Sequence, residues 1–327
     1  MNVFSRRAPV LAALVAIAGC STTASQTSLP SAGAYTFVHR GVPFVPSLRT
    51  THPVRYSISR TYSTKGSLIF EGDQSQGQTN VYTTKGITSN SAPIASMKAS
   101  TGCPYGIAAD KKGTIYVADN CAVGDVEEFP KGSTTMSKAI TDGISYPLGL
   151  AMDKSQTLYV SNYPAAITEY AYGTTSPSKT VTDSQLKDPF GLALDKSGNL
   201  YIADFGASAV FELPKGGSGV TNLGLQDLTE PIGVAVDQKH NLLWVTDGQG
   251  DKINVYKLGS TSPIETISGQ GFPYAISLQE SGKPKGEVVY SDLGTETIYA
   301  FKPGSYTPYA SFNSGVSLPT GLLIAHP

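Results

Sequence analysis

One short element recurs along most of this chain at an almost constant interval. It consists of a proline, one variable residue and a glycine or alanine. The prolines are Pro104, Pro147, Pro189, Pro231, Pro273 and Pro319, and successive prolines lie 43, 42, 42, 42 and 46 residues apart. A period of this length indicates an array of similar units, each of which buries its apolar faces against its neighbours.

Each repeat contains four short segments with the composition of strands. An apolar segment follows the proline, and a tight turn such as Asp195-Lys-Ser-Gly198 separates it from a second segment such as Leu200-Tyr-Ile-Ala-Asp204. A third segment carries two apolar residues three apart, such as Val210 and Leu213, and a turn rich in Lys, Pro and Gly leads to the fourth. Four strands per repeat predict the blade of a β-propeller. A β-sandwich, the alternative, does not predict so strict a period.

The ends of the array predict how the ring closes. The earliest second strand, Leu68 to Asp73, has no proline element before it, and the last proline element, at Pro319, has no second strand after it. We therefore predict an all-β protein, a six-bladed β-propeller with four-stranded blades over residues 66–327. In this ring the C-terminal strand Thr320 to Ala325 pairs with Leu68 to Asp73 of the first blade, which removes the open sheet edges.

The repeat sequence resembles a known family of propellers. The run Pro189-Phe-Gly-Leu-Ala-Leu-Asp-Lys-Ser-Gly-Asn-Leu-Tyr-Ile-Ala-Asp204 is similar to NHL repeats, and more loosely to the gluconolactonase (regucalcin-like) and virginiamycin-lyase propellers. The resemblance covers about residues 66–326 and implies a six-bladed propeller. It predicts architecture better than function, because such folds host unrelated activities.

The catalytic groups of the two enzyme families are not evident in the repeats. The chain has four histidines, His39, His52, His240 and His326, and no repeat places one near the Pro-x-Gly loops. A lyase or lactonase of this type would therefore lack a histidine general base there, unless His39 or His52 reached in from the N-terminal segment. We expect no catalytic residues among the repeats.

Metal ligands are also missing at the expected positions. The gluconolactonase-like family takes oxygen ligands for a divalent cation largely from the residue after the proline. Here those residues are Tyr105, Leu148, Phe190, Ile232, Tyr274 and Thr320, none of which is a carboxylate or an amide. Because Ca²⁺ needs six to eight oxygen ligands, we expect no metal at this mouth and no cofactor.

The aromatic residues at these positions have two interpretations. Tyr105, Phe190 and Tyr274 either pack the neck of the channel or line a pocket for a small ligand or a peptide end. Asp188 and Glu230, each just before a proline, are the carboxylates nearest this mouth, as ligand-binding groups or as solvated loop charges. The polar residues that end the second strands recur in every blade, so we expect them to cap turns.

The two cysteines of the repeat region are predicted to form a disulfide. Cys103 precedes the first strand of its blade and Cys121 follows the second. Because these strands are antiparallel neighbours, both cysteines lie at one face, within the Cα separation that a disulfide needs. Export would permit oxidation. Two free thiols are the alternative.

The N-terminus is a targeting segment. Arg6 and Arg7 precede an apolar run, Ala8 to Ala18, that is too short to span a bilayer as a helix. Ile17-Ala18-Gly19-Cys20 resembles a bacterial lipoprotein signal, which implies that residues 1–19 are removed and that the Cys20 thiol carries a palmitate-like lipid. An ordinary secretory signal is the alternative, and twin-arginine export fits poorly.

Two further segments precede the repeats. Residues 20–34 are Ser/Thr-rich and are expected to form a flexible tether. Residues 35–65 carry apolar residues such as Phe37 and Phe44, and are expected to pack on the propeller.

Charge and motifs together predict the class of function. The net charge is −1 with no basic run, so no nucleic-acid partner is expected. We expect a monomer in the bacterial cell envelope, on the periplasmic or surface side, that contacts the membrane only through its lipid; secretion is the alternative. Its predicted function is non-enzymatic binding of an envelope protein, peptide or glycan through the loop face. A gluconolactonase-like hydrolase or lyase and a purely structural surface protein are the alternatives.

Overall fold

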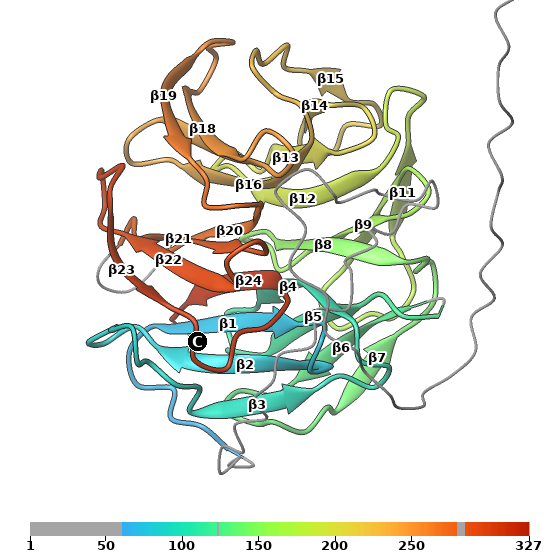
Figure 1. The fold of residues 1–327 in the computed structure, drawn as a ribbon. Helices are drawn as coiled ribbons and strands as arrows, with labels where there is room; N and C mark the ends of the chain where they lie inside the picture. Colours follow the sequence, from blue (N-terminus) through green and yellow to red (C-terminus); the bar gives the residue numbers. More distant parts are fainter. Residues whose placement is uncertain (1–60, 123, 280–284, 327) are drawn as a thin grey trace, which may run out of the picture. The chain divides into compact units, whose positions relative to one another are not determined.

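The computed structural model describes residues 61–122, 124–279 and 285–326. These residues form six four-stranded antiparallel sheets, the blades, around a common centre (Figure 1). Each strand with a Pro-x-Gly element is the innermost of its blade and contacts the innermost strands of the two neighbouring blades, so that the ring is complete. Nowhere in the described ranges is there a helix long and apolar enough to cross a membrane.

The blades follow one another along the chain, and the strands of each blade run from the innermost to the outermost in the following order. Blade 1 consists of β24 (Pro319–Ala325), β1 (Leu68–Asp73), β2 (Gln78–Thr83) and β3 (Ala95–Lys98); blade 2 of β4 (Pro104–Ala109), β5 (Ile115–Asp119), β6 (Asp125–Phe129) and β7 (Lys138–Ile140); and blade 3 of β8 (Pro147–Met152), β9 (Leu158–Asn162), β10 (Ala166–Tyr170) and β11 (Lys179–Thr182). Blade 4 consists of β12 (Pro189–Leu194), β13 (Leu200–Asp204), β14 (Ala209–Leu213) and β15 (Thr221–Asn222); blade 5 of β16 (Pro231–Asp237), β17 (Leu242–Asp247), β18 (Lys252–Lys257) and β19 (Pro263–Ser268); and blade 6 of β20 (Pro273–Leu278), β21 (Val288–Asp292), β22 (Thr297–Phe301) and β23 (Pro308–Phe312).

The ring is closed by strands from the two ends of the repeat array, as predicted. β24 pairs antiparallel with β1, and Ile69 lies opposite Ile324 and Phe70 opposite Leu323. Ile69, Phe70 and Ile324 are fully or almost fully buried. Because blade 1 takes its innermost strand from the far end of the chain, the apolar pairing of β24 with β1 joins the first and last blades and leaves no open innermost edge.

Close approach of the inner strands explains the glycine of the repeat. A Cβ added at Gly149 would clash with the carbonyl oxygen of Phe190 in the next blade, and one added at Gly321 with the carbonyl oxygen of Tyr105. No larger residue fits there without a backbone shift, so the Pro-x-Gly element recurs with the period of the blades.

Hydroxyl groups bridge adjacent blades at the same level. The Ser161 Oγ donates to the Phe190 carbonyl at 2.7 Å, and the Thr246 Oγ1 to the Tyr274 carbonyl at 2.5 Å. The Ser291 Oγ donates to the Pro319 carbonyl at 2.9 Å. Each buried bridge contributes about 1 kcal/mol. The bridges connect blade 3 to 4, blade 5 to 6 and blade 6 to 1.

The N-terminal edge of the described region packs on the outside of the first two blades. The Tyr62 N–H donates to the Gly132 carbonyl at 2.9 Å, and the Tyr62 ring lies edge-on to Phe70, 5.9 Å between centroids. Tyr62 thus contacts the first two blades, and the packing of residues 35–65 as a segment stays a prediction. The predicted signal (1–19), the tether (20–34) and residues 35–60 lie outside the described residues.

The close approach of the inner strands gives a stability prediction. We expect Gly149→Ala to lower the free energy of unfolding by about 1–3 kcal/mol, since its methyl group must displace the neighbouring strand. Urea denaturation followed by circular dichroism measures the change. Gly219→Ala is the control: its only neighbour within 4 Å is the Asp183 carboxylate at 3.3 Å, so its effect should stay within about 0.5 kcal/mol. Equal effects of the two substitutions would contradict the explanation.

Candidate functional site

The Pro-x-Gly ends of the inner strands and the ends of the second strands lie on one side of the propeller, which we call the loop face. It consists of the segments before the inner strands and those between the second and third strands. These are 74–77, 99–103, 120–122, 124, 141–146, 163–165, 183–188, 205–208, 223–230, 248–251, 269–272, 293–296 and 313–318. All sequence-predicted ligand-binding residues lie on this face or at the strand ends beneath it.

Buried acceptor side chains organise these loops. Both carboxylate oxygens of Asp204 accept backbone hydrogen bonds, from the N–H groups of Lys187, Asp188 and Ala207 at 2.8–2.9 Å. The corresponding residues of the other blades accept backbone N–H groups in the same way; they are Asp73, Asp119, Asn162, Asp247 and Asp292. The predicted capping role is confirmed. Burial raises the pKa of Asp73, Asp204 and Asp292, and the backbone N–H groups oppose that rise.

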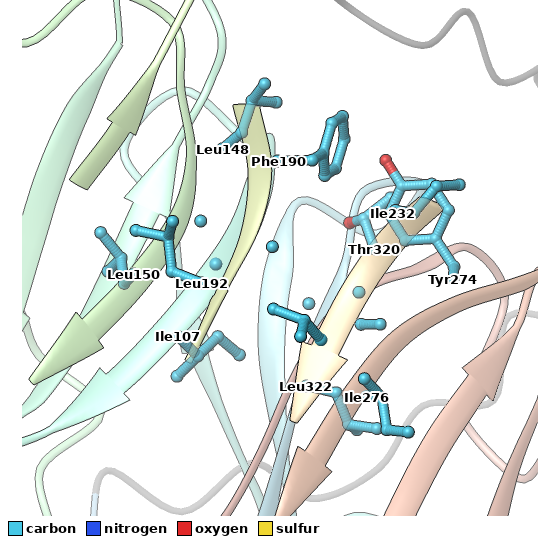
Figure 2. A pocket seen from close by; sticks show the side chains of 17 residues that line it. Ile107, Leu148, Leu150, Phe190, Leu192, Ile232, Tyr274, Ile276, Thr320 and Leu322 are labelled. Atoms are coloured by element: carbon cyan, nitrogen blue, oxygen red, sulfur yellow. The ribbon is translucent and has the colours of Figure 1, made fainter. Parts of the chain in front are cut away.

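The residues after the prolines are buried at the loop-face end of the inner strands, and Figure 2 shows Leu148, Phe190, Ile232 and Tyr274 around a cavity. Tyr105, Phe190 and Tyr274 are 0%, 4% and 1% exposed, and Leu148 and Ile232 are equally buried. The Phe190 ring lies edge-on to Tyr105 at 6.1 Å and to Tyr274 at 5.5 Å between centroids. We call these five residues the plug. Their mutual packing matches the first of the two interpretations, in which they fill the neck.

Leu148, Phe190, Ile232 and Tyr274 of the plug also line a small cavity along the inner strands. Its volume is about 60 Å³, and its side-chain lining is mostly aliphatic, including Ile107, Leu150, Leu192, Ile276 and Leu322 (Figure 2). Binding sites for small molecules usually have volumes of ~300–1,000 Å³. The cavity has room for a few water molecules at most and does not form a small-molecule pocket.

The phenols of the plug do not supply a base. The Tyr105 hydroxyl donates to Gln74 Oε1 at 3.4 Å, and the buried Tyr274 hydroxyl interacts with that of Tyr105. Burial raises the pKa of both phenols, that of Tyr274 well above its usual value. Both are therefore neutral at physiological pH, and neither can abstract a proton.

The two predicted carboxylates are separate from the plug. Asp188 and Glu230 are half-buried in the loops before β12 and β16, and neither lines the cavity. Burial raises the pKa of Glu230, with a smaller contribution from the Asp247 carboxylate, and its Oε2 atom has no hydrogen-bond partner. The structure brings the three aromatic residues together and leaves both carboxylates outside that cluster.

Histidine is absent from the loop face in the described part of the chain. His240 lies in the β16–β17 turn on the opposite side, where its Nδ1 atom is 2.5 Å from Oδ2 of Asp237. His326 follows β24. His39 and His52 fall outside the described residues.

A tyrosine pair on blade 3 was not predicted from the sequence. Tyr146 is 37% exposed with a φ of 45°, and its ring lies edge-on to Tyr163, 6.5 Å between centroids. Tyr146 directly precedes Pro147, a position that varies among the blades. The variation at this position among the blades could have drawn attention to Tyr146. Variation alone, however, does not distinguish an exposed ring from a buried one.

The cysteines form the predicted disulfide. Cys103 and Cys121 are bonded, with their Cα atoms 5.3 Å apart. The bond joins the loop before β4 to the loop after β5, so blade 2 has a covalent link across its part of the loop face.

Comparison with known proteins identifies the fold only. No family model matches the chain, and no curated protein matches it. Among solved structures, a crystal structure of a nidogen/laminin complex matches with a TM-score of 0.68 and 17% identity, over 79% of this chain and 98% of that one. A protein of unknown function from Bacteroides caccae matches with a TM-score of 0.60 and 9% identity, over 80% and 99%. A streptogramin B lyase structure matches with a TM-score of 0.52 and 14% identity, over 76% and 75%. The predicted resemblance to NHL-like and lyase-like propellers is confirmed at the level of the fold.

A buried glutamate beneath the loop face departs from the repeat. Glu71 in β1 is fully buried, at a position where the other second strands carry Val117, Val160, Ile202, Val245 and Tyr290. Its Oε2 atom accepts a hydrogen bond from Asn80 Nδ2 at 3.0 Å, and its Oε1 atom has no hydrogen-bond partner within the described ranges. Burial, and to a lesser extent the nearby Asp73 carboxylate, raises the pKa of Glu71 well above its usual range.

The raised pKa of Glu71 predicts a pH-dependent effect of Glu71→Gln. A raised folded-state pKa contributes stability that is fully present below the unfolded-state pKa and is lost as pH rises toward the folded-state pKa, and glutamine lacks this loss. We expect the variant to be more stable than wild type at about pH 8, by ~1–3 kcal/mol, with the difference shrinking toward about pH 5. Urea denaturation across this range measures it, with exposed Glu265→Gln as control. A difference independent of pH would refute the assignment.

Proposed function

We propose that this chain is a non-enzymatic binding module that engages a protein partner through its loop face. The observation that carries the proposal is the plug. Because Tyr105, Phe190 and Tyr274 fill the neck, the surface available to a partner is that of the loops around it and not a pocket within the channel.

The tyrosine pair gives this surface a point of contact. Tyr146 is exposed beside Tyr163, and tyrosines are enriched among the residues that dominate protein interfaces, since a large rigid ring carries a polar hydroxyl. The low net charge favours a partner recognised by shape and apolar contact rather than by strong electrostatic attraction. The fold likeness to a propeller in a nidogen/laminin complex supports a protein partner. A peptide and a glycan are the other ligands that such a surface suits.

Substitutions on the two faces test the proposal. Immobilised wild type is compared with the double variant Tyr146→Ser, Tyr163→Ser in capture from bacterial envelope extracts, and the captured protein is then purified and titrated against both. We expect the double variant to bind at least tenfold more weakly. Tyr172→Ser is the control, because Tyr172 is 43% exposed in the β10–β11 turn on the opposite side.

Two results would overturn the proposal. One is undiminished binding of the purified partner by the double variant. The other is turnover of lactones or esters by the purified protein that is abolished by a substitution in the plug, which would favour the hydrolase or lyase alternative. If no protein, peptide or glycan binds, a purely structural role is supported instead.

The proposal includes an anchor in the cell envelope at Cys20. Metabolic labelling with an alkyne analogue of palmitate should mark the wild type and not Cys20→Ser, and the variant should move from the membrane fraction to the soluble fraction. The other two cysteines are bonded to each other, so they do not provide a second labelling site. An unlabelled wild type in the soluble fraction would disprove the anchor without affecting the binding proposal.

A further inference from the structure

Three carboxylates meet on the loop face of blade 2. They belong to Asp119 at the end of β5 and to Asp125 and Glu127 in β6, and one oxygen from each lies within 4.8 Å of the others. Asp119 and Asp125 are direct partners in the antiparallel pairing of these strands. Like charges at such a position are destabilising unless something compensates them.

Asp119 accepts backbone N–H groups on both oxygens, but the other two carboxylates of the cluster are poorly satisfied by the protein. Glu127 is 0% exposed; its Oε1 atom accepts the Ser100 N–H at 2.5 Å, while its Oε2 atom has no hydrogen-bond partner in the part of the chain that the structure describes. The Oδ1 atom of the half-buried Asp125 is also buried without a partner. Among the described residues, no lysine or arginine forms an ion pair with any of the three carboxylates. A buried carboxylate oxygen without a partner is neutralised by a proton or by a positive charge, and three carboxylates at one place favour a cation.

The other blades provide an internal comparison. All six blades place an Asp or Asn at the end of the second strand, with a direct partner at the start of the third strand. At the position of Asp125 the other blades carry Gln78, Ala166, Ala209, Lys252 and Thr297, and at the position of Glu127 they carry Asn80, Thr168, Phe211, Asn254 and Tyr299. Blade 2 is the only described blade with an acid at either position.

In blade 5 a lysine lies beside the acidic residue that ends the second strand. There the Lys252 side chain starts from the position of Asp125, and its Nζ atom lies 4.0 Å from Asp247 Oδ2 and 2.5 Å from Asp227 Oδ1. A positive charge thus lies beside the end of the second strand in blade 5. In blade 2 the same place is bordered by three acids and no described cation.

We propose that Asp119, Asp125 and Glu127 form a Ca²⁺-binding site. Carboxylate oxygens are the ligands that Ca²⁺ prefers, and two oxygens bound to one Ca²⁺ at 2.3–2.6 Å lie at most about 5 Å apart, which agrees with the spacing of the cluster. Cys103 and Cys121 lie nearby but are bonded to each other, so they offer no thiolate for zinc. The half-buried Asp125 leaves the cluster open to water, which can complete the coordination shell.

Calcium titration of the full-length protein tests the site. After treatment with EGTA, wild type should bind one Ca²⁺ by isothermal titration calorimetry and unfold at a higher temperature in CaCl₂ than in EGTA. Glu127→Gln and Asp125→Asn should each weaken binding at least tenfold. Glu128→Gln, on the same strand, is the matched control, because Glu128 pairs with Lys138 at 3.3 Å. This variant should keep the calcium response.

A double variant distinguishes loss of the calcium site from loss of folding. Asp125→Lys with Glu127→Asn copies the residues of blade 5 into blade 2. This variant should unfold in EGTA at a higher temperature than wild type in EGTA, because the lysine supplies the missing positive charge, and calcium should not shift it further. Absence of calcium binding by wild type at millimolar concentration, or full binding by the double variant, would overturn the site. Binding of Mg²⁺ as tight as that of Ca²⁺ would overturn the choice of metal.

Discussion

The close approach of the six inner strands is the constraint on which the rest of the molecule depends. At Gly149 a single methyl group would collide with the next strand, so the strands meet backbone to backbone, and hydroxyls such as that of Ser161 bridge them directly. A ring this tight leaves a cavity of only about 60 Å³ at its centre. The residues after the prolines therefore surround a cavity too small for a ligand, and Tyr105 and Phe190 also pack on each other. Because the centre holds no ligand-sized pocket, the surface that differs among the blades is that of the loops.

The fold was predictable because every blade must satisfy this same constraint. Proline returns with each inner strand and glycine with five of the six, Ala275 replacing it in β20, so the period, the blade count and the pairing of β24 with β1 could all be derived from spacing. The capping role of Asp204 and its counterparts followed from their recurrence. The choice between plug and pocket did not follow, because the strand register shifts just after the proline, as between Pro189 and Leu192, and the direction of the intervening side chain depends on that irregularity.

Two groups of residues were missed because they depend on pairings between strands. Glu71 occupies the place of an apolar residue. In the sequence it is a single polar residue within a strand, and its burial is not evident. The cluster around Glu127 becomes visible only when β5 and β6 are in register. The two exceptions also differ physically. Glu71 has an amide donor in Asn80, so a single proton can neutralise the remaining oxygen. Asp119 and Glu127 accept four backbone N–H groups between them, but with Asp125 they concentrate three carboxylates and no described cation at one place.

The departures from the repeat on the loop face gather on neighbouring blades. The disulfide and the acidic cluster belong to blade 2, and the exposed tyrosine pair belongs to blade 3. Asn120, directly after Asp119, donates from its Nδ2 atom to the Pro147 carbonyl at 2.9 Å, one residue from Tyr146. The loop that holds the acids is therefore bonded to the segment that presents the tyrosine. If an ion and a protein partner both order these loops, thermodynamic linkage requires that each strengthen the binding of the other by the same factor. Partner binding would then depend on calcium through the hydrogen bond between Asn120 and Pro147, without any contact between the ion and the partner.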